Sequence, residues 1–352
     1  MFIEGQGNLL KAEVDALVNT VNTVGVMGRG VALQFKQAFP HNFRAYQAAC
    51  RRGEVMLGHM FVTRTGQLRP EFIINFPTKK HWREQSRLET IRTGLVDLIA
   101  VVRRESIRSI ALPPLGCGLG GLRWEDVHPL IVQAFSELPQ VEVHLYPPGH
   151  DVSAEERVIR TPRPEMTLWR AALICLIGAY SRLAFEASHL EAQKLLYFLV
   201  EAGEPLPTKF AKGDYGPYDD GMKHGLLEME GHYIQGFGEG KRLDPVSLAP
   251  GALEAARSYL RASPDTVARI ERVTRLIEGF ETPYGLELLA SVHWAATREA
   301  RAANRSLEQV VELVHAWTER KRRTLRARDL QVAWEQLQAQ GWLPLPEPEW
   351  PH

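Results

Sequence analysis

Residues 1–147 alternate short apolar runs with segments of helical periodicity, and this alternation restricts the first part of the chain to a layered α/β sheet. Strands are predicted at the apolar runs 15–22, 59–64, 71–78, 109–116 and 141–147. Helices are predicted at 30–53, 86–106 and 125–138. A helix that follows each buried strand covers the sheet, so this part of the chain is expected to form one domain.

The pattern changes after residue 147. Residues 147–166 are polar and rich in proline, which is typical of a linker. Long helical patterns follow, and the length of 352 residues is sufficient for two domains. We therefore predict an α/β domain at 1–152, a linker at 153–166 and a mainly helical domain at 167–352.

Composition excludes some classes of protein. Basic and acidic residues balance at 42 each, so the chain has no overall charge that would attract nucleic acid, although a local basic patch is compatible with this balance. The three cysteines are far apart and form no metal-binding pair, and their odd number favours a reducing cytoplasm. The sequence predicts neither a signal peptide nor a membrane span, and hence a cytoplasmic location.

Three glycine-rich stretches, at 4–10, 19–35 and 112–122, mark loops of the α/β domain. Glycine lets backbone N–H groups approach an anion, and a helix that begins after the loop adds a favourable dipole. Two such loops side by side fit a diphosphate, whereas each loop alone is equally compatible with a tight turn. Neither the P-loop motif nor the dinucleotide fingerprint is present. The pattern favours a nucleotide-like ligand.

The stretches at 15–22, 28–32 and 112–119 resemble the macrodomain family, in particular the subgroup of the terminal ADP-ribose protein glycohydrolase. This resemblance covers about residues 1–150. It implies a three-layer α/β/α fold around a mixed sheet, with a cleft for ADP-ribose at the strand ends. ADP-ribose is then a substrate moiety and a product, and no cofactor is expected.

The resemblance also assigns roles to individual residues. Asn8 and Leu9 would lie beside the adenine, although many macrodomains have aspartate at the first of these positions. Asn22 would contact the distal ribose and take part in catalysis. The glycine loops would surround the diphosphate and the distal ribose. The complete predicted ligand-binding set is Asn8, Leu9, Asn22, Gly28, Arg29, Gly30, Val31, Pro114, Gly116, Cys117, Gly118, Leu119 and Gly120.

Two lysines follow the strand at 71–78. In the related glycohydrolases a lysine at this point is catalytic, and the matching residue is Lys80, which would act at the anomeric carbon of the distal ribose. A lysine at a strand end is otherwise usually a solvated charge, and we expect Lys79 to point into solvent. The human-type member of this subgroup also has an acidic residue shortly after the run that matches 116–119, and the corresponding position in this chain is Gly120.

Several other side chains near these motifs have a simpler interpretation. Cys117 has no histidine paired with it in the sequence and is predicted to be a packing residue rather than a nucleophile. His81 is compatible with the rim of the cleft or with open surface. The histidines show no metal-ligand spacing, so no metal is predicted. Arg83 and Arg87 are either solvated or hold DNA phosphates.

Residues 190–237 resemble the SocA-like antitoxin domain, also called Panacea. The matching pieces are 194–197, 210–218 and 229–231, and such domains are associated with neutralising a toxin by binding it. Tyr215 and Tyr218 suit either an interface or a half-buried core. No catalytic constellation is evident in this half.

The two halves together resemble the DarG family of antitoxins. Its members reverse the action of DarT-like toxins, which attach ADP-ribose to thymidine in single-stranded DNA. The resemblance implies hydrolysis of that bond, with ADP-ribosylated single-stranded DNA as substrate and a DarT-like toxin as partner of the C-terminal domain. Two alternatives are a non-catalytic reader of ADP-ribose and a glycohydrolase of protein-linked mono-ADP-ribose. Neutralisation by protein contact alone is also compatible with the sequence.

Overall fold

The computed structural model describes residues 1–149, 152, 156–183, 186–206, 208–238, 245–300 and 306–343. The chain divides into two compact units, Met1–Pro162 and Arg163–His352. Within the predicted linker, the Arg160 amide donates to Gln37 O (2.9 Å) in the first unit. Pro164 O accepts a hydrogen bond of 2.7 Å from the Tyr233 hydroxyl in the second. Residues 153–155 of the predicted linker lie outside the described residues.

The first unit is a six-stranded mixed sheet with the strand order β1-β6-β5-β2-β4-β3. All neighbouring pairs are parallel except β3 and β4. Its strands are β1 (Phe2–Glu4), β2 (Ala16–Asn22), β3 (Phe61–Arg64), β4 (Phe72–Lys79), β5 (Ser109–Leu112) and β6 (Glu142–Leu145). Its helices are η1 (Leu9–Lys11), α1 (Gly30–Ala38), α2 (Pro40–Arg51), α3 (Leu88–Arg104) and α4 (Trp124–Phe135).

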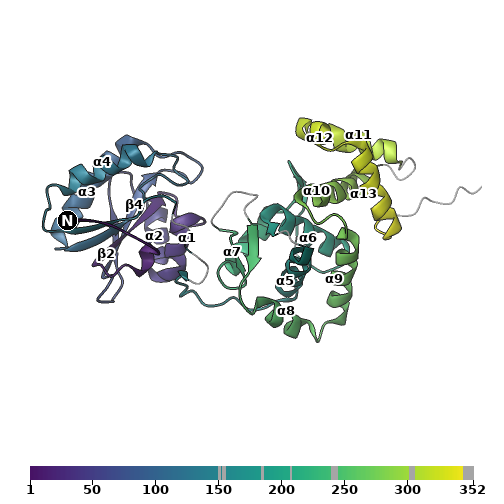
Figure 1. Cartoon of the computed structure of the whole chain (residues 1–352), viewed down its shortest axis with the longest axis horizontal. Helices are drawn as coiled ribbons and strands as arrows, with labels where there is room; N and C mark the ends of the chain where they lie inside the picture. The colour runs from purple at the N-terminus through teal and green to yellow at the C-terminus, as the bar shows by residue number, and fades with distance from the viewer. Residues whose placement is uncertain are drawn as a thin grey trace, which may run out of the picture. The chain divides into compact units, whose positions relative to one another are not determined.

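Helices cover both faces of this sheet (Figure 1). Successive side chains of a strand point to opposite faces, so Ala16 and Val18 of β2 pack in the cluster that includes residues of α3 and α4. Leu17, between them, packs in the cluster that includes Phe35 of α1. Seven consecutive residues of β4 are buried because the strand is covered on both sides. The predicted three-layer α/β/α fold is confirmed.

The single helix predicted at 30–53 is wrong in one respect, because the segment forms two helices. Phe39 separates α1 from α2, and Pro40 is the first residue of α2. Proline lacks the N–H that would continue a helix and is accommodated in the first turn of a new one. Because of this break, α2 lies against the end of β2, where its Tyr46 bonds to Asn22.

The second unit is mainly helical, as predicted. Its helices are α5 (Leu168–Tyr180), α6 (His189–Glu201), α7 (Asp220–Met229), α8 (Ala252–Leu260), α9 (Pro264–Ile277), α10 (Pro283–Trp294), α11 (Leu307–Trp317), α12 (Glu319–Thr324) and α13 (Ala327–Ala339). Short turns of helix are η3 (Ser181–Leu183) and the π-helix η4 (Ala295–Glu299). Its strands are β7 (Ala187–Ser188), β8 (Ala211–Gly213), β9 (Gly216–Tyr218), β10 (Ile234–Gln235) and β11 (Pro245–Leu248). One hydrophobic cluster runs through these helices, with α5, α6 and α10 contributing largely buried faces.

Candidate active site

Three loops meet at one edge of the first unit's sheet. Strands β5, β2 and β4 are neighbours and parallel, so the loops that follow them, 113–123, 23–29 and 80–87, leave from the same edge. The Thr23 amide donates to Lys80 O (3.0 Å), and the Ser86 amide donates to Gly120 O (2.9 Å). The loop after β4 is therefore bonded to both others. The C-terminal edge of parallel strands is where α/β sheets bind ligands.

Asn22, at the end of β2, is buried and shapes the loop that follows it. Its Oδ1 atom accepts from the amides of Val24 (3.0 Å) and Val26 (3.3 Å), and its Nδ2 atom donates to Val26 O (2.6 Å). Both ends of the amide are thus engaged within the protein. The predicted contact between Asn22 and the distal ribose stays a prediction, but the structure gives this residue a clear function in folding the loop.

Tyr46 of α2 forms hydrogen bonds to Asn22, and the sequence did not predict this role. Its hydroxyl donates to Asn22 O (2.6 Å) and lies 3.2 Å from Asn22 Oδ1. The side chain is fully buried, and burial raises the pKa of its hydroxyl, so it remains protonated. The only signal in the sequence is a tyrosine on the apolar face of a helix, which does not distinguish a positioning group from ordinary core.

The first predicted phosphate loop leads into α1. Arg29 is the N-cap of this helix in extended conformation, and no side chain caps the helix. Gly30 has a φ of 55°, which an L-residue rarely adopts. The first amides of a helix lack partners within it, so the first turn of α1, which begins at Gly30, offers N–H groups and the positive end of the helix dipole to an anion.

The second predicted phosphate loop is a compact turn after β5. The Cys117 amide donates to Pro114 O (3.1 Å), and the Leu122 amide donates to Gly116 O (3.0 Å). Gly116 has a φ of 72°. Gly118 and Leu119 are exposed at the tip. This turn brings six of the predicted ligand-binding residues together, and their contact with the diphosphate stays a prediction.

The surroundings of Gly120, where the resemblance implies an acidic residue, leave no room for a side chain. A Cβ atom at this position would lie 2.3 Å from Gly116 O and 2.5 Å from Ser86 Oγ. These distances are far below ordinary contact, so the turn closes only around glycine. An acidic side chain at position 120 is therefore incompatible with this turn.

The two lysines after β4 differ from each other. Lys80 is exposed, and its backbone oxygen accepts from the amide and the hydroxyl of Thr23. The prediction that Lys79 points into solvent is wrong, because its Nζ atom donates to Leu119 O (2.8 Å). Burial lowers the pKa of Lys79, and Glu84 opposes this shift. Lys79 thus connects the end of β4 to the second glycine loop.

The adenine-side residues are held by the fold. Asn8 caps η1 through a hydrogen bond from the Leu10 amide to its Oδ1 atom (2.9 Å), and its Nδ2 atom donates to Glu156 O (2.7 Å). Leu9 is buried against the cluster that contains Phe35. Their predicted contact with adenine remains a prediction.

Cys117 and His81 occupy ordinary environments. Burial raises the pKa of the Cys117 thiol to about 11, and Glu125 and Asp126 add to the shift, which keeps the group protonated at neutral pH. His81 Nδ1 accepts from the Arg83 amide (3.3 Å) in a turn. Among the described residues, no group of three His, Cys, Asp or Glu side chains is placed to hold a metal ion.

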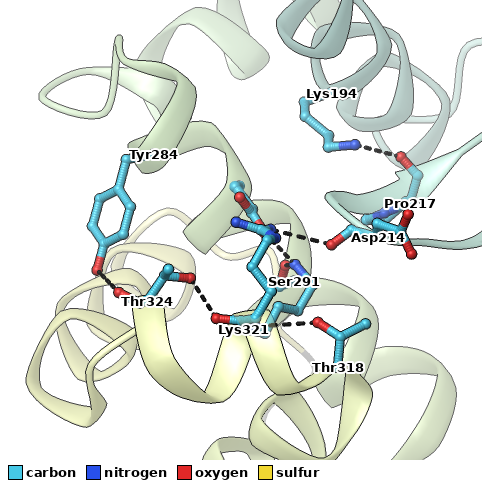
Figure 2. A network of polar contacts seen from close by, with 10 residues as sticks. Lys194, Asp214, Pro217, Tyr284, Ser291, Thr318, Lys321 and Thr324 are labelled. Carbon is cyan, nitrogen blue, oxygen red and sulfur yellow. Dashed lines mark hydrogen bonds and ion pairs between the residues drawn. The ribbon is translucent and has the colours of Figure 1, made fainter. Parts of the chain in front are cut away.

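A buried polar network organises the second unit (Figure 2). Lys194 of α6 donates to Pro217 O (2.7 Å) in β9, and Lys321 of α12 donates to Ser291 Oγ (2.8 Å) and Glu287 Oε1 (2.6 Å) of α10. Gly216 has a φ of 100°, and a Cβ atom there would lie 3.3 Å from the Lys194 side chain. The lysine and the glycine–proline pair of the antitoxin-like motif therefore belong to one structural network.

The two tyrosines of this motif are half-buried. The guanidinium of Arg320 lies 4.2 Å from the centroid of the Tyr215 ring. Tyr218 meets the His189 ring edge to face, with centroids 5.8 Å apart. Both tyrosines thus contact partners within the unit and keep part of their surface accessible. Within the described parts of the chain, no helix is both long and apolar enough to cross a membrane.

Known proteins agree with this architecture. The Macro domain family matches residues 18–131. A DNA ADP-ribosyl glycohydrolase of Thermus aquaticus is 48% identical over 96% of this chain and 93% of its own length. A DNA ADP-ribosyl transferase–DNA ADP-ribosyl glycohydrolase fusion protein of Thermosipho africanus is 33% identical over 41% of each chain. The solved macrodomain of Mycobacterium tuberculosis DarG is 59% identical over 42% of this chain and 99% of that chain, with a TM-score of 0.42.

The sheet order, the glycine loops at the strand ends and the family match define the first unit as a macrodomain. The second unit extends the similarity to nearly the whole chain. The chain belongs to the DNA ADP-ribosyl glycohydrolase family, and it is a glycohydrolase.

Proposed function

We propose that this protein hydrolyses the N-glycosidic bond between ADP-ribose and thymidine in DNA, and so reverses DNA ADP-ribosylation. The observation that carries the proposal is the 48% identity to the Thermus aquaticus glycohydrolase over 96% of the chain. The three bonded loops at the sheet edge support it, because two of them offer backbone N–H groups for a diphosphate. The third begins at Lys80, directly after Lys79 at the end of β4.

Lys80 is the proposed group at the reacting carbon. Its amine acts at the anomeric carbon of the distal ribose, as nucleophile or as base. The bond from this carbon to the base nitrogen breaks. Water supplies a hydroxyl group to the carbon and a proton to the nitrogen. The products are free ADP-ribose and unmodified DNA, and because nothing is oxidised or reduced the reaction uses no redox cofactor.

An oligonucleotide that carries ADP-ribose on one thymidine tests this function. The intact protein is expected to release unmodified DNA on a gel, whereas Lys80→Ala loses turnover but still binds ADP-ribose. Lys11→Ala is a matched control, because Lys11 is an exposed lysine on η1. Binding of ADP-ribose by the intact protein without release of DNA would make it a reader, and cleavage of a protein-linked substrate alone would change the substrate class.

We also propose that the helical unit binds a DarT-like toxin, and that the protein acts in the cytoplasm. The half-buried Tyr215 and Tyr218 support this, because tyrosines with accessible rings are frequent at protein interfaces. The three free cysteines agree with a reducing compartment. Full-length Lys80→Ala protein separates binding from hydrolysis. It is expected to reduce the DNA-modifying activity of such a toxin at stoichiometric amounts, and an unaffected toxin would contradict the proposal.

A further inference from the structure

The loop after Lys80 exposes an aromatic and basic surface. Trp82 is 42% exposed. The His81 ring lies 5.1 Å from the Trp82 ring, and the Arg83 guanidinium lies 4.6 Å from the ring centroid. The three consecutive residues thus form a group of planar side chains directly after the proposed catalytic lysine. We call His81, Trp82 and Arg83 the aromatic–basic turn.

This turn is fixed between the two predicted phosphate loops. Lys80 O is bonded to Thr23 on one side, and the Ser86 amide is bonded to Gly120 O on the other. Each of the two flanking loops also exposes an apolar side chain, Val24 at 47% and Leu119 at 57%. In the proposed function the distal ribose lies at this edge, so the DNA attached to it would extend past these loops.

Exposed apolar side chains are common on protein surfaces, and the charged residues near Trp82 give its exposure a meaning. Arg83 and Arg87 are both exposed, and among the described residues neither forms an ion pair with a carboxylate. Arg52, Arg64 and Arg103 of the same unit have carboxylate partners, whereas Arg44 and Arg92, like Arg83 and Arg87, have none among the described residues. Arg83 and Arg87 differ from these two in that they lie on the loop that exposes Trp82. Two cations without anionic partners beside an exposed indole have the chemistry of a surface that binds single-stranded nucleic acid, in which bases stack and phosphates are neutralised.

We propose that the aromatic–basic turn binds the DNA strand next to the modified thymidine, with Trp82 stacking on a neighbouring base and with Arg83 and Arg87 contacting phosphates. This inference rests on the proposed function. It explains how a chain with no net charge holds a DNA substrate, because the cations need to be concentrated only at this loop. Stacking is independent of base identity, so little sequence preference is expected on this side of the thymidine.

Two substrates distinguish the proposed contact between Trp82 and a neighbouring base from the cleavage of the glycosidic bond. One is an ADP-ribosylated thymidine mononucleotide, and the other is the same nucleotide within a short single strand. Trp82→Ala is expected to lower kcat/KM for the single strand by about 5-fold to 100-fold and to leave the mononucleotide unchanged. Trp82→Phe keeps a ring and should retain most activity. Val96→Ala, at an exposed position on α3, is the control.

Equal losses on both substrates, or no loss on either, would overturn the inference. If the intact protein cleaves neither substrate, the proposed function fails, and binding of a fluorescent unmodified single strand then decides the question. Weaker anisotropy binding by Trp82→Ala would support the turn as a DNA contact, and unchanged binding would refute it. The double variant Arg83→Ala, Arg87→Ala should also lower the salt dependence of this binding, with a slope reduced by about 1 to 2.

Discussion

The ammonium of Lys79 lies 2.8 Å from the carbonyl oxygen of Leu119, and this contact joins the end of β4 to the glycine loop after β5. Lys79 and Lys80, although consecutive, are therefore in different environments. Lys79 holds the loop that is predicted to surround the diphosphate, whereas Lys80 is exposed and is the proposed catalytic lysine.

Lys79→Met should accordingly weaken the binding of ADP-ribose more than it slows the chemical step of cleavage. A hydrogen bond from a charged donor contributes about 1.5–3 kcal/mol, and the partial exposure of Lys79 favours the lower end, which corresponds to roughly tenfold weaker ADP-ribose binding. Calorimetric titration with ADP-ribose measures the affinity, and single-turnover cleavage measures the chemical step. Lys79→Arg retains a charged donor and should be closer to the intact protein. A Lys79→Met variant with normal affinity and no turnover would show that this lysine is the reacting one.

Tyr46→Phe should disturb the loop after β2 through Asn22. The variant removes the hydroxyl that donates to Asn22 O and leaves that buried oxygen without this donor. We expect the free energy of unfolding to fall by about 1 kcal/mol, with weaker ADP-ribose binding in parallel. Tyr259→Phe, at an exposed position on α8, is the control. Denaturant unfolding and titration check both effects, and normal affinity in Tyr46→Phe would mean that Asn22 is held without the hydroxyl.

Gly120→Ala should destabilise the second glycine loop, whereas Gly118→Ala should not. A Cβ at Gly120 meets Gly116 O at 2.3 Å, but at Gly118 no atom lies within 4 Å. Backbone must shift in the first variant only, at a cost of roughly 1–3 kcal/mol. Thermal unfolding of the two variants compares them directly. Equal stability would show that the loop adapts to a side chain, and the steric explanation for the missing acid would then fail.

Stability of the helical unit should rise between pH 7 and pH 9. Burial lowers the pKa of Lys194 to about 7, and the nearby Lys321 adds to this while Glu287 opposes it. The unfolded lysine keeps its proton up to about pH 10.4, so over this window the unfolded chain binds more protons than the folded one. Unfolding free energy then increases with pH, by at most about 1.4 kcal/mol per unit for one lysine. Below pH 7 both states are protonated and this gain is absent.

Lys194→Met removes the titrating group and should flatten this dependence. Calorimetric unfolding at pH 7 and pH 9, on the intact protein and the variant, measures the difference. Lys321, whose pKa burial also lowers, remains in the variant and leaves a smaller slope. An unchanged slope would assign the effect to other groups, and a slope of opposite sign would contradict the charged-state assignment.

Local patterns determined much of the fold. Apolar runs of strand length gave β2 to β6 within a few residues, and helical spacing gave α3 and α4. Strand β1 has only three residues, which are too few for a hydrophobic pattern in the sequence. It joins the sheet through parallel pairing with β6. The buried side chains of Asn19 in β2 and Asn42 in α2 both bond to the amide of Asn75 in β4. Asparagine is uncommon in strands, so the sequence pattern did not predict this buried group.

The sequence by itself determined the α/β alternation, the glycine loops and the position of Lys80, because each depends on residues close together along the chain. The tertiary structure decided which backbone oxygen receives Lys79, which helix supports Asn22 and why position 120 excludes a side chain. These contacts join residues 24 to 40 positions apart, or depend on the closure of a turn. They follow from strand order and helix packing, which periodicity alone does not specify.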